Sequence, residues 1–471
     1  MNKTKVVATI GPSSQSKEVI KGLIEAGMDV ARINLKHADY DFCMDVVNKI
    51  NELNEELGTH VALMFDLKGP EIRVGNFFNG EAEFVAGTKI RIYTDDTLGD
   101  ETKLSINYPK LIEDVNYDSL IKVDDGHVVF QVLDKGQDYL LCEVVTGGKL
   151  TNHKGVNIPG VRLDIPFLSD QDKDDILLAN TLNADFLALS YINTHEDILE
   201  VNDLLINMGN DHIGIIAKIE NERALEDLEE IIKVSDGIMV ARGDLGVEVE
   251  VERVPGIQKA IISKCHVAGK VSIVATEMLS SMEDNATPTR AEVSDVANAV
   301  LDGTDAVMLS DETTIGFFPI ETLKTMEKII HSAEQDVNYL EFMDKAIRTE
   351  TKDTTGLISY NVAQTANYLK CKAIFAPTIS GYTARKISRF RPSCPIIAAS
   401  PNPLTVKSLQ LHYGVLPVQI NELKTFDRIV EASKKMVKDI IETEKGDKIV
   451  VTGGYPFKDV KHTNFLKIEE L

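Results

Sequence analysis

Short apolar runs alternate with longer helical patterns along most of this chain, and no other feature constrains the fold as strongly. Strand-like runs cover Thr4–Ile10, Asp29–Asn34 and Val61–Asp66, and the segments between them, Ser16–Ala26 and Ala38–Leu57, have helical periodicity. A strand–helix–strand repeat predicts parallel strands, because the connecting helix returns the chain to the same end of the sheet.

The alternation stops after Asp66 and resumes near Pro166. The intervening segment is short-patterned and rich in turns, which predicts a small β-domain inserted in a loop. Five further strand and helix pairs follow, with strands that end near Ser190, Glu220, Asp244, Thr276 and Ser310. A count of eight strands and eight helices predicts an α/β fold with a closed (β/α)8 TIM barrel.

We therefore predict four segments along the chain. Residues 1–68 and 166–343 form the barrel, residues 69–165 form the inserted β cap, and residues 344–471 form a C-terminal α/β domain. The polar stretch Asp344–Thr355 is expected to be a linker. The C-terminal domain has neither a GxGxxG sequence nor a Walker A sequence, so it carries no nucleotide fingerprint.

Two carboxylates and a lysine stand at the ends of successive predicted strands. Gly237–Val249 is an apolar run in which Asp244 lies among glycines, and the preceding strand, Gly214–Asn221, carries Lys218 and Glu220. Alternation along a strand puts Lys218 and Glu220 on the same side. Since burial of such charges is costly without partners, we expect Glu220 and Asp244 to share a divalent cation beside Lys218. For the Gly-Asp-Leu-Gly segment alone, a solvated turn is the alternative.

The acidic composition excludes several classes of partner. The formal net charge is -24, from 50 basic and 74 acidic residues, which disfavours nucleic acid and anionic membranes as ligands. The five cysteines are scattered without a CxxC sequence, which is typical of reduced cytosolic thiols. No apolar run approaches the roughly 20 residues that a membrane helix needs. We expect a cytoplasmic protein that meets anionic substrates through a local basic cluster.

The motifs of the whole chain resemble those of the pyruvate kinase family. The matching stretches are KTKVVATIGPSS, AGMDVARIN, DLKGPEIR, VDDG, KGVNIPG, AKIEN, DGIMVARGDLGVE, ATEMLSSM, PTRAEVSDVANAVLDGTDAVMLS, SGYTARKISRFRP and TNFLKI. The resemblance implies a barrel, a mobile β-domain over its mouth and a C-terminal regulatory domain, in agreement with the periodicity. It also implies a homotetramer that transfers the phosphoryl group of phosphoenolpyruvate to ADP, giving ATP and, through an enolate, pyruvate, in the last step of glycolysis.

Site residues follow from the resemblance by matching motif. For catalysis it implies Lys218, Thr276, Arg32 and Ser310. For phosphoenolpyruvate it implies Arg32, Ser190, Lys218, Gly243, Asp244 and Thr276. For Mg²⁺ or Mn²⁺ it implies Glu220 and Asp244, and for the nucleotide Pro12, Asn34, His37, Arg73 and Lys154. Lys218 would stabilise the phosphoryl group and the enolate, while Thr276 and Ser310 would support proton transfer to the enolate methylene.

Lys36 departs from the family pattern at a monovalent cation site. The resemblance implies a K⁺ site made of Asn34, Asp66, the carbonyl of Leu67 and a serine, and that serine is Lys36 here. An ammonium only donates hydrogen bonds, so it cannot ligate K⁺. We hypothesise that Lys36 takes the place of K⁺, paired with Asp66, and makes activity independent of K⁺. The alternative is that Lys36 turns to solvent and the site is lost.

Further departures surround the site. Asn193 stands where the family often has arginine after a serine-phenylalanine pair, here Ser190-Tyr191, and Arg223 stands where an acidic or small polar residue is usual. Glu277 and Asp311 add negative charge, which would weaken anion binding by like-charge repulsion.

The C-terminal domain offers a candidate effector site. Thr378, Ser380, Gly381 and Thr383 lead into a predicted helix, an arrangement that suits an anion, and the resemblance implies a phosphorylated allosteric effector there. A capping loop without ligand is the alternative.

Two other functions remain open at this point. The first is a divalent-metal lyase or aldolase acting on a pyruvate enolate, and the second is a catalytically weak regulatory homologue. The inserted cap and Lys218 favour the phosphotransferase over the lyase, since both point to a nucleotide.

Overall fold

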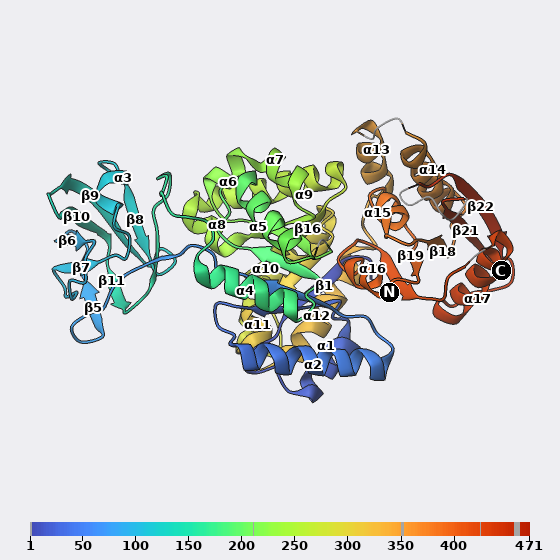
Figure 1. The fold of residues 1–471 in the computed structure, drawn as a ribbon, viewed down its shortest axis with the longest axis horizontal. Helices are drawn as coiled ribbons and strands as arrows, with labels where there is room; N and C mark the ends of the chain where they lie inside the picture. The colour runs from blue at the N-terminus through green and yellow to red at the C-terminus, as the bar shows by residue number, and fades with distance from the viewer. Residues whose placement is uncertain (1, 211, 350–352, 424, 456–461) are drawn as a thin grey trace.

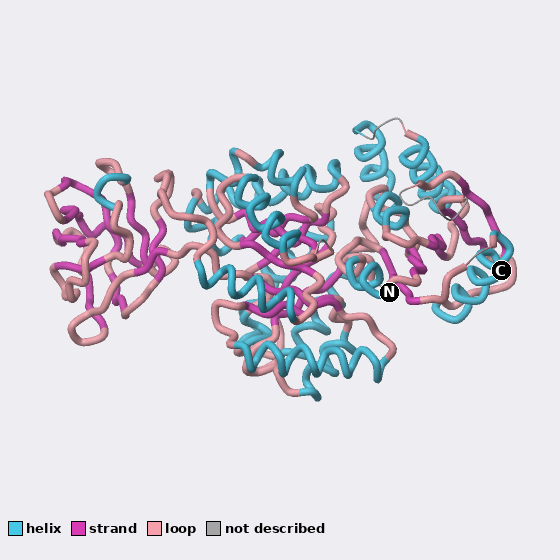
Figure 2. The backbone as a smooth tube through the Cα atoms, in the orientation of Figure 1, coloured by secondary structure: helices cyan, strands magenta, loops and turns pink. Residues whose placement is uncertain are grey.

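The computed structural model describes residues 2–210, 212–349, 353–423, 425–455 and 462–471. Figure 1 shows three lobes in a row, with a β-rich lobe at one end, a barrel in the middle and an α/β lobe with the C-terminus at the other end. In Figure 2 the strands of the middle lobe lie at its centre and the helices surround them.

Eight parallel strands close the middle lobe into a barrel in the order β1, β17, β16, β15, β14, β13, β3, β2, which confirms the predicted TIM barrel. Their bounds are Lys5–Thr9 (β1), Val30–Asn34 (β2), Ala62–Asp66 (β3), Phe186–Leu189 (β13), Gly214–Ile219 (β14), Gly237–Ala241 (β15), Val271–Ala275 (β16) and Ala306–Leu309 (β17). Both faces of these strands are buried, which explains why their sequences are continuous apolar runs. Val7 and Met64 fill the interior, whereas their neighbours Val6 and Phe65 pack under the helices.

The helices around the barrel begin and end at clear sequence signals. Their bounds are Lys17–Ala26 (α1), Tyr40–Leu57 (α2), Asp170–Thr181 (α4), His195–Asn207 (α5), Glu222–Glu226 (α6), Leu228–Val234 (α7), Arg242–Glu248 (α8), Val254–Ala268 (α9), Arg290–Leu301 (α10), Asp311–Thr314 (α11) and Pro319–Ala333 (α12), with 3-10 turns at Val251–Arg253 (η1) and Ser280–Glu283 (η2). Ser169 and Thr289 form capping boxes at α4 and α10. Gly27 ends α1 with a φ of 115°, a conformation that favours glycine.

The β-rich lobe is the segment inserted between β3 and β13. Its elements are Ile72–Arg73 (β4), Glu81–Phe84 (β5), Lys89–Tyr93 (β6), Lys103–Ser105 (β7), Leu111–Asp114 (α3), Leu120–Val123 (β8), Val128–Lys135 (β9), Tyr139–Thr146 (β10), Gly148–Thr151 (β11) and Gly155–Asn157 (β12). The sheet order is β4-β12-β8-β9-β10-β6-β7, with β11 and β5 paired separately. Alternating burial, as in Glu81–Phe84, gives this lobe a core of its own. The predicted β cap is present, and its bounds, like those of the other domains, stay predictions.

The C-terminal lobe contains a five-stranded sheet in the order β20-β19-β18-β21-β22, with β22 antiparallel to β21. Its elements are Thr354–Tyr368 (α14), Ala373–Pro377 (β18), Tyr382–Ser388 (α15), Ile396–Ser400 (β19), Pro403–Ser408 (α16), Val415–Gln419 (β20), Phe426–Ile440 (α17), Lys448–Gly453 (β21) and Phe465–Glu470 (β22). The predicted second α/β sheet is confirmed.

The predicted linker at Asp344–Thr355 is wrong over most of its described length. Helix α13 spans Tyr339–Thr349, and α14 begins at Thr354, while residues 350–352 lie outside the described part of the chain. Helix α13 has an apolar stripe among its many charged residues, and Met343 and Ala346 on this stripe are buried in a cluster with Phe390. Within the described residues, none of the helices combines the length and the apolar character that crossing a membrane requires.

The two added lobes contact opposite ends of the barrel. On the side where the strands end, Lys122 of the cap donates to the carbonyl of Val247 at 2.5 Å, and Asn157 donates to Glu248 at 2.8 Å. At the other end, Arg391 donates to Asp305, the residue before β17, at 2.8 Å. The barrel mouth therefore lies beneath the cap, and the C-terminal lobe covers the far end.

Candidate active site

A small cavity of about 120 Å³ lies at the carboxyl ends of the barrel strands. It is lined by Arg32, Asn34, Lys36, Asp66, Leu67, Lys68, Glu71, Ser190, Tyr191, Lys218, Glu220, Met239, Ala241, Asp244, Thr276 and Met308. A larger cleft of about 690 Å³ between barrel and cap shares four of these residues, Lys36, Glu71, Tyr191 and Asp244. The two spaces therefore meet, as a site for two substrates requires.

Lys218 is the buried cation at the centre of the small cavity. Its ammonium lies 2.8 Å from Glu220 Oε1 and 3.4 Å from Asp66 Oδ1, and it donates to Ser190 Oγ at 2.7 Å. Burial alone would lower the pKa of Lys218, but the carboxylates of Asp66 and Glu220 outweigh burial and raise it. The side chain therefore keeps a full positive charge, which can face an anion entering the cavity.

Arg32 extends this positive surface. Its Nε donates to Asp66 Oδ2 at 2.7 Å, and its Nη1 donates to Thr9 at 2.8 Å. Burial would raise the pKa of Asp66, but Arg32 and Lys218 hold it below the ordinary value, so the carboxylate stays ionised. Asp66 thereby fixes both cations and the hydroxyl of Ser190, which donates to its Oδ1 at 3.1 Å.

Glu220 and Asp244 are two carboxylates of the cavity that share a neighbour, Tyr191. Glu220 is fully buried, and burial, with the charge of Asp244, raises its pKa to about 7 against the pull of Lys218. Tyr191 donates to both: its backbone N–H to Glu220 Oε2 at 2.5 Å and its hydroxyl to Asp244 Oδ1 at 3.1 Å. The two carboxylates face the single ammonium of Lys218, and such oxygen ligands fit a hard divalent cation such as Mg²⁺ or Mn²⁺.

Gly243 and Thr276 are adjacent, but Ser310 stands apart from them. The backbone N–H of Gly243 donates to Thr276 Oγ1 at 2.8 Å, at the start of α8. Asp244 thus lies in a short helix rather than in the solvated turn considered above. Among the described residues the Ser310 hydroxyl is buried without a hydrogen-bond partner, and Ser310 does not line the small cavity.

The predicted pairing of Lys36 with Asp66 is wrong. Lys36 Nζ donates to Glu71 Oε1 at 2.5 Å, whereas Asp66 is paired with Arg32 and Lys218. The reason is geometric, since both partners of Asp66 are buried around it while Lys36 reaches Glu71 from the rim of the cavity. Burial would raise the pKa of Glu71, but Lys36 and then Arg73 hold it low.

The predicted nucleotide residues are distributed unevenly. Arg73 and Lys154 line the large cleft, where Arg73 is paired with Glu71 and Lys154 lies 2.8 Å from Asp124. Asn34 lines the small cavity, and its side chain accepts from the backbone of Lys36 at 3.1 Å. His37 and Pro12 are exposed and line neither space. Burial and then Lys36 lower the pKa of His37.

The other departures from the family pattern separate into two groups. Asn193 and Arg223 both line the cleft, so Arg223 supplies a cation to its lining. Glu277 and Asp311 are exposed and line neither space, so the expected repulsion has little structural basis.

A separate pocket of about 80 Å³ lies in the C-terminal lobe and includes Thr378, Ser380 and Thr383. Gly381 begins α15 with a φ of 77° and does not line the pocket. The Thr383 hydroxyl is bonded to that of Thr463 at 2.8 Å, and Glu422 brings a negative charge to the lining.

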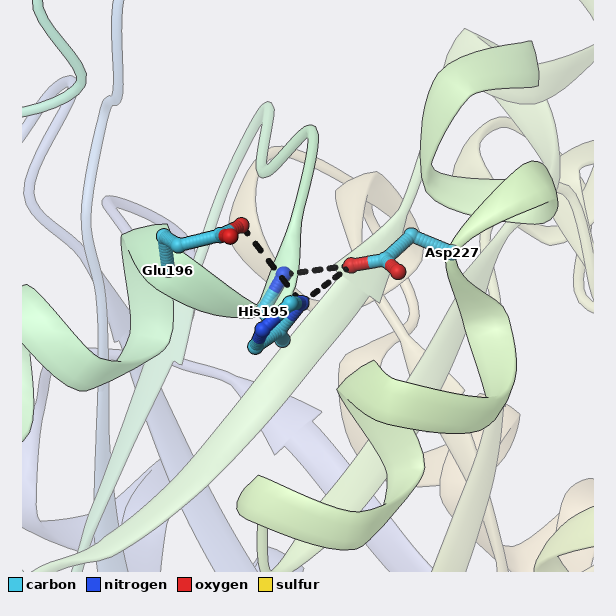
Figure 3. Close-up of side chains that lie close together, drawn as sticks. All are labelled: His195, Glu196 and Asp227. Atoms are coloured by element: carbon cyan, nitrogen blue, oxygen red, sulfur yellow. Dashed lines mark hydrogen bonds and ion pairs between the residues drawn. The ribbon is translucent and has the colours of Figure 1, made fainter.

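His195, Glu196 and Asp227 form a second cluster with metal-ligand chemistry (Figure 3), and none of the three lines the cavity or the cleft. His195 Nδ1 lies 2.8 Å from Asp227 Oδ2 and 3.4 Å from Glu196 Oε2. Asp227 Oδ2 also accepts from the backbone N–H of His195 at 2.7 Å, at the first residue of α5. Because a helix N-terminus repels cations, we interpret the cluster as a cap that joins α5 to α7.

Two contributors to the site were not predicted. Glu71 carries the pairing of Lys36, and Tyr191 contacts both candidate metal carboxylates. The position of Glu71 directly before Ile72 and Arg73, at the junction with the cap, could have pointed to it. The sequence around Tyr191 gives no indication that its hydroxyl contacts Asp244.

Comparisons with known proteins agree with this geometry. Two family-level sequence profiles match, "Pyruvate kinase, barrel domain" over residues 1–323 and "Pyruvate kinase, alpha/beta domain" over residues 357–469. A pyruvate kinase of Clostridium perfringens is 43% identical over 474 residues, covering 100% of both chains. One of Sporosarcina psychrophila is 42% identical over 470 residues, covering 99% of this chain and 80% of the other. The crystal structure of a pyruvate kinase from Cryptosporidium parvum matches with a TM-score of 0.94 at 35% identity, covering 100% of this chain and 96% of that one. The chain belongs to the pyruvate kinase family.

Proposed function

We propose a role for each residue of the barrel mouth in the reaction that this chain catalyses. That reaction is the transfer of the phosphoryl group of phosphoenolpyruvate to ADP, which gives ATP and pyruvate and is the last step of glycolysis. One observation carries the assignment: the buried ammonium of Lys218 lies 2.8 Å from the candidate metal ligand Glu220, at the meeting point of a small cavity and a cleft.

Lys218 and Arg32 stabilise the charge of the transferred phosphoryl group, and Ser190 donates to it. Phosphoryl transfer needs little covalent help from the protein, so positioning and charge stabilisation supply most of the rate. Both cations are held by the buried Asp66, which means that they need no rearrangement when the substrate arrives. Lys218 also stabilises the enolate that the transfer leaves behind.

Glu220 and Asp244 hold the divalent ion, Mg²⁺ or Mn²⁺. When bound, the ion supplies Lewis-acid stabilisation of the phosphoryl and enolate oxygens. The backbone of Gly243 and Asp244, with Thr276, binds the substrate carboxylate beside this pair. Thr276 and the unpartnered hydroxyl of Ser310 then support protonation of the enolate methylene.

The nucleotide enters through the large cleft. Arg73 and Lys154, which both belong to the cap and line the cleft, face its phosphates. Asn34, in the adjoining small cavity, and His37 and Pro12, outside both spaces, complete the proposed nucleotide set. Each of the two cations holds a carboxylate that the phosphates can replace, Glu71 for Arg73 and Asp124 for Lys154. Closure of the cap onto the cleft would exclude water during transfer.

Lys36 makes the activity independent of K⁺ through Glu71 rather than through Asp66. Its ammonium neutralises Glu71 at 2.5 Å, beside Asn34, Asp66 and Leu67, which would otherwise surround a monovalent cation. Assays in buffer free of Na⁺ and K⁺, with and without KCl, test this. We expect little response from the natural enzyme, and we expect Lys36→Ser to lose activity without KCl and to regain it with KCl. Strong K⁺ activation of the natural enzyme would contradict the proposal.

The C-terminal pocket with Thr378, Ser380 and Thr383, next to Gly381, binds a phosphorylated allosteric effector, and the chain works as a cytoplasmic homotetramer. Hydroxyl groups at the start of α15 support the effector site, and membership of the family supports the tetramer. A thermal-shift screen with sugar phosphates and AMP tests the pocket, for which an unchanged melting temperature with every compound would favour a plain capping loop. Light scattering at assay concentration tests the tetramer.

A coupled assay with phosphoenolpyruvate, ADP and Mg²⁺ tests the function as a whole, with Lys218→Met as the inactive control. The full-length match to pyruvate kinases supports the phosphotransferase over the two alternatives. Pyruvate at the level of the control would favour the weak regulatory homologue, and a cleavage activity in its place would favour the lyase or aldolase.

A further inference from the structure

Tyr191 is the one residue in the described part of the chain that donates to both candidate metal ligands. It follows Ser190 at the end of β13, where its backbone N–H donates to Glu220 Oε2 at 2.5 Å. Its hydroxyl donates to Asp244 Oδ1 at 3.1 Å.

The backbone at Tyr191 is held in an unusual conformation. Its φ is 55°, in the left-handed region that side chains other than glycine rarely adopt. Such a conformation persists only where the surroundings enforce it. Here the bond to the buried Glu220 turns the N–H inward, and the turn aims the side chain toward Asp244.

The hydroxyl leaves the second oxygen of Asp244 available. A carboxylate has two oxygens, and a donor on one of them restricts rotation of the group without blocking the other. Asp244 lies in the first turn of the short helix α8, and Tyr191 Oη is the side-chain donor that the structure shows for its Oδ1. Partners of this kind orient metal ligands in proteins, and their loss typically weakens metal binding by about 10- to 100-fold.

We propose that Tyr191 is a positioning residue for the divalent cation, which holds the Asp244 carboxylate in its binding orientation before the cation arrives. The proposal rests on the assignment of Glu220 and Asp244 as the divalent site. It predicts that this enzyme binds its divalent ion more tightly than an otherwise identical chain with phenylalanine at the position.

Tyr191→Phe tests the proposal, because it removes the hydroxyl and keeps the ring and the backbone bond. Free Mn²⁺ is measured by electron paramagnetic resonance in titrations of the full chain without substrates, so the readout does not depend on activity. We expect the Kd for Mn²⁺ to rise about tenfold, the low end of that range.

The chain offers a matched control in the cap. Tyr108 also donates its hydroxyl to a carboxylate, Asp114, and neither residue lines the cavity or the cleft, so Tyr108→Phe should leave the Mn²⁺ affinity unchanged. Circular dichroism melts of each variant, with and without Mn²⁺, show whether the fold is intact and give the stabilisation by the ion as a second measure.

The outcomes separate two failures. If Tyr191→Phe binds Mn²⁺ as tightly as the natural enzyme, or more tightly, the positioning role is overturned. If Asp244→Ala also leaves Mn²⁺ affinity unchanged, the assignment of the divalent site itself is wrong, and the role of Tyr191 falls with it. A loss in both Asp244→Ala and Tyr191→Phe, with Tyr108→Phe unaffected, supports the proposal.

Discussion

Replacement of Lys218 by methionine tests the centre of the site, because it removes the charge and keeps a side chain of similar length. Lys218 is 8% exposed, and its ammonium lies 3.4 Å from Asp66 and 2.8 Å from Glu220. The loss of one preorganised charge-stabilising donor typically lowers kcat by about 10²- to 10³-fold, which corresponds to roughly 2.7–4 kcal/mol. We expect a loss of at least this size, since Lys218 would serve both the phosphoryl group and the enolate.

The same replacement leaves Asp66 and Glu220 buried with one cation fewer. Breaking a buried pair in this way costs about 3–5 kcal/mol of stability, so unfolding must be measured beside activity. Pyruvate formation is followed through NADH oxidation by lactate dehydrogenase, at a temperature where circular dichroism shows the variant folded. Lys17→Met, which removes an exposed lysine bridging Glu52 and Glu56, is the control and should retain full activity. A folded Lys218→Met enzyme with kcat close to the natural value would refute the reasoning.

Two further predictions concern the remainder of the fold. Arg391→Leu removes the buried partner of Asp305 between the barrel and the C-terminal lobe, and it should lower the free energy of unfolding by about 3–5 kcal/mol in urea titrations. The control Arg428→Leu, at an exposed ion pair, should change this free energy by no more than about 0.5 kcal/mol. Equal effects of the two replacements would contradict the prediction. The hydrogen bond that His195 donates to the Asp227 carboxylate raises the pKa of His195 above the ordinary 6.5, so its contribution to stability is complete below pH 6.5 and disappears as pH rises through the folded value. A proton NMR titration of His195 should show this raised pKa, and Asp227→Asn should return it toward 6.5; a natural value at or below 6.5 would count against the cap.

The interpretation of the barrel mouth depended on features that are local in sequence. Alternation along one strand was sufficient to place Lys218 and Glu220 on the same side, and the two side chains are indeed paired. The strand count was sufficient to predict closure, and closure brings the carboxyl ends of all strands together, which explains why Arg32, Asp66 and Asp244 line one cavity.

The errors arose where a side chain had a choice of partners. Lys36 had two acidic candidates, Asp66 and Glu71, and only the three-dimensional arrangement shows that Asp66 is already surrounded by Arg32 and Lys218. The prediction of a linker after Asp344 is wrong for a related reason. The segment is mostly polar, but its few apolar residues form a stripe that packs on Phe390, a residue distant in sequence.

The sequence by itself determined the barrel, the inserted cap, the second α/β sheet and the places of Lys218 and Glu220 on one strand, because periodicity and strand ends are properties of short segments. Only the tertiary structure decided which charges pair, that Asp244 lies in the first turn of a helix, and that Tyr191 reaches from one candidate metal ligand to the other. Those outcomes depend on contacts between residues far apart in the chain. The energies of these contacts depend on burial and on competition among neighbouring side chains, and neither can be predicted from a local sequence pattern.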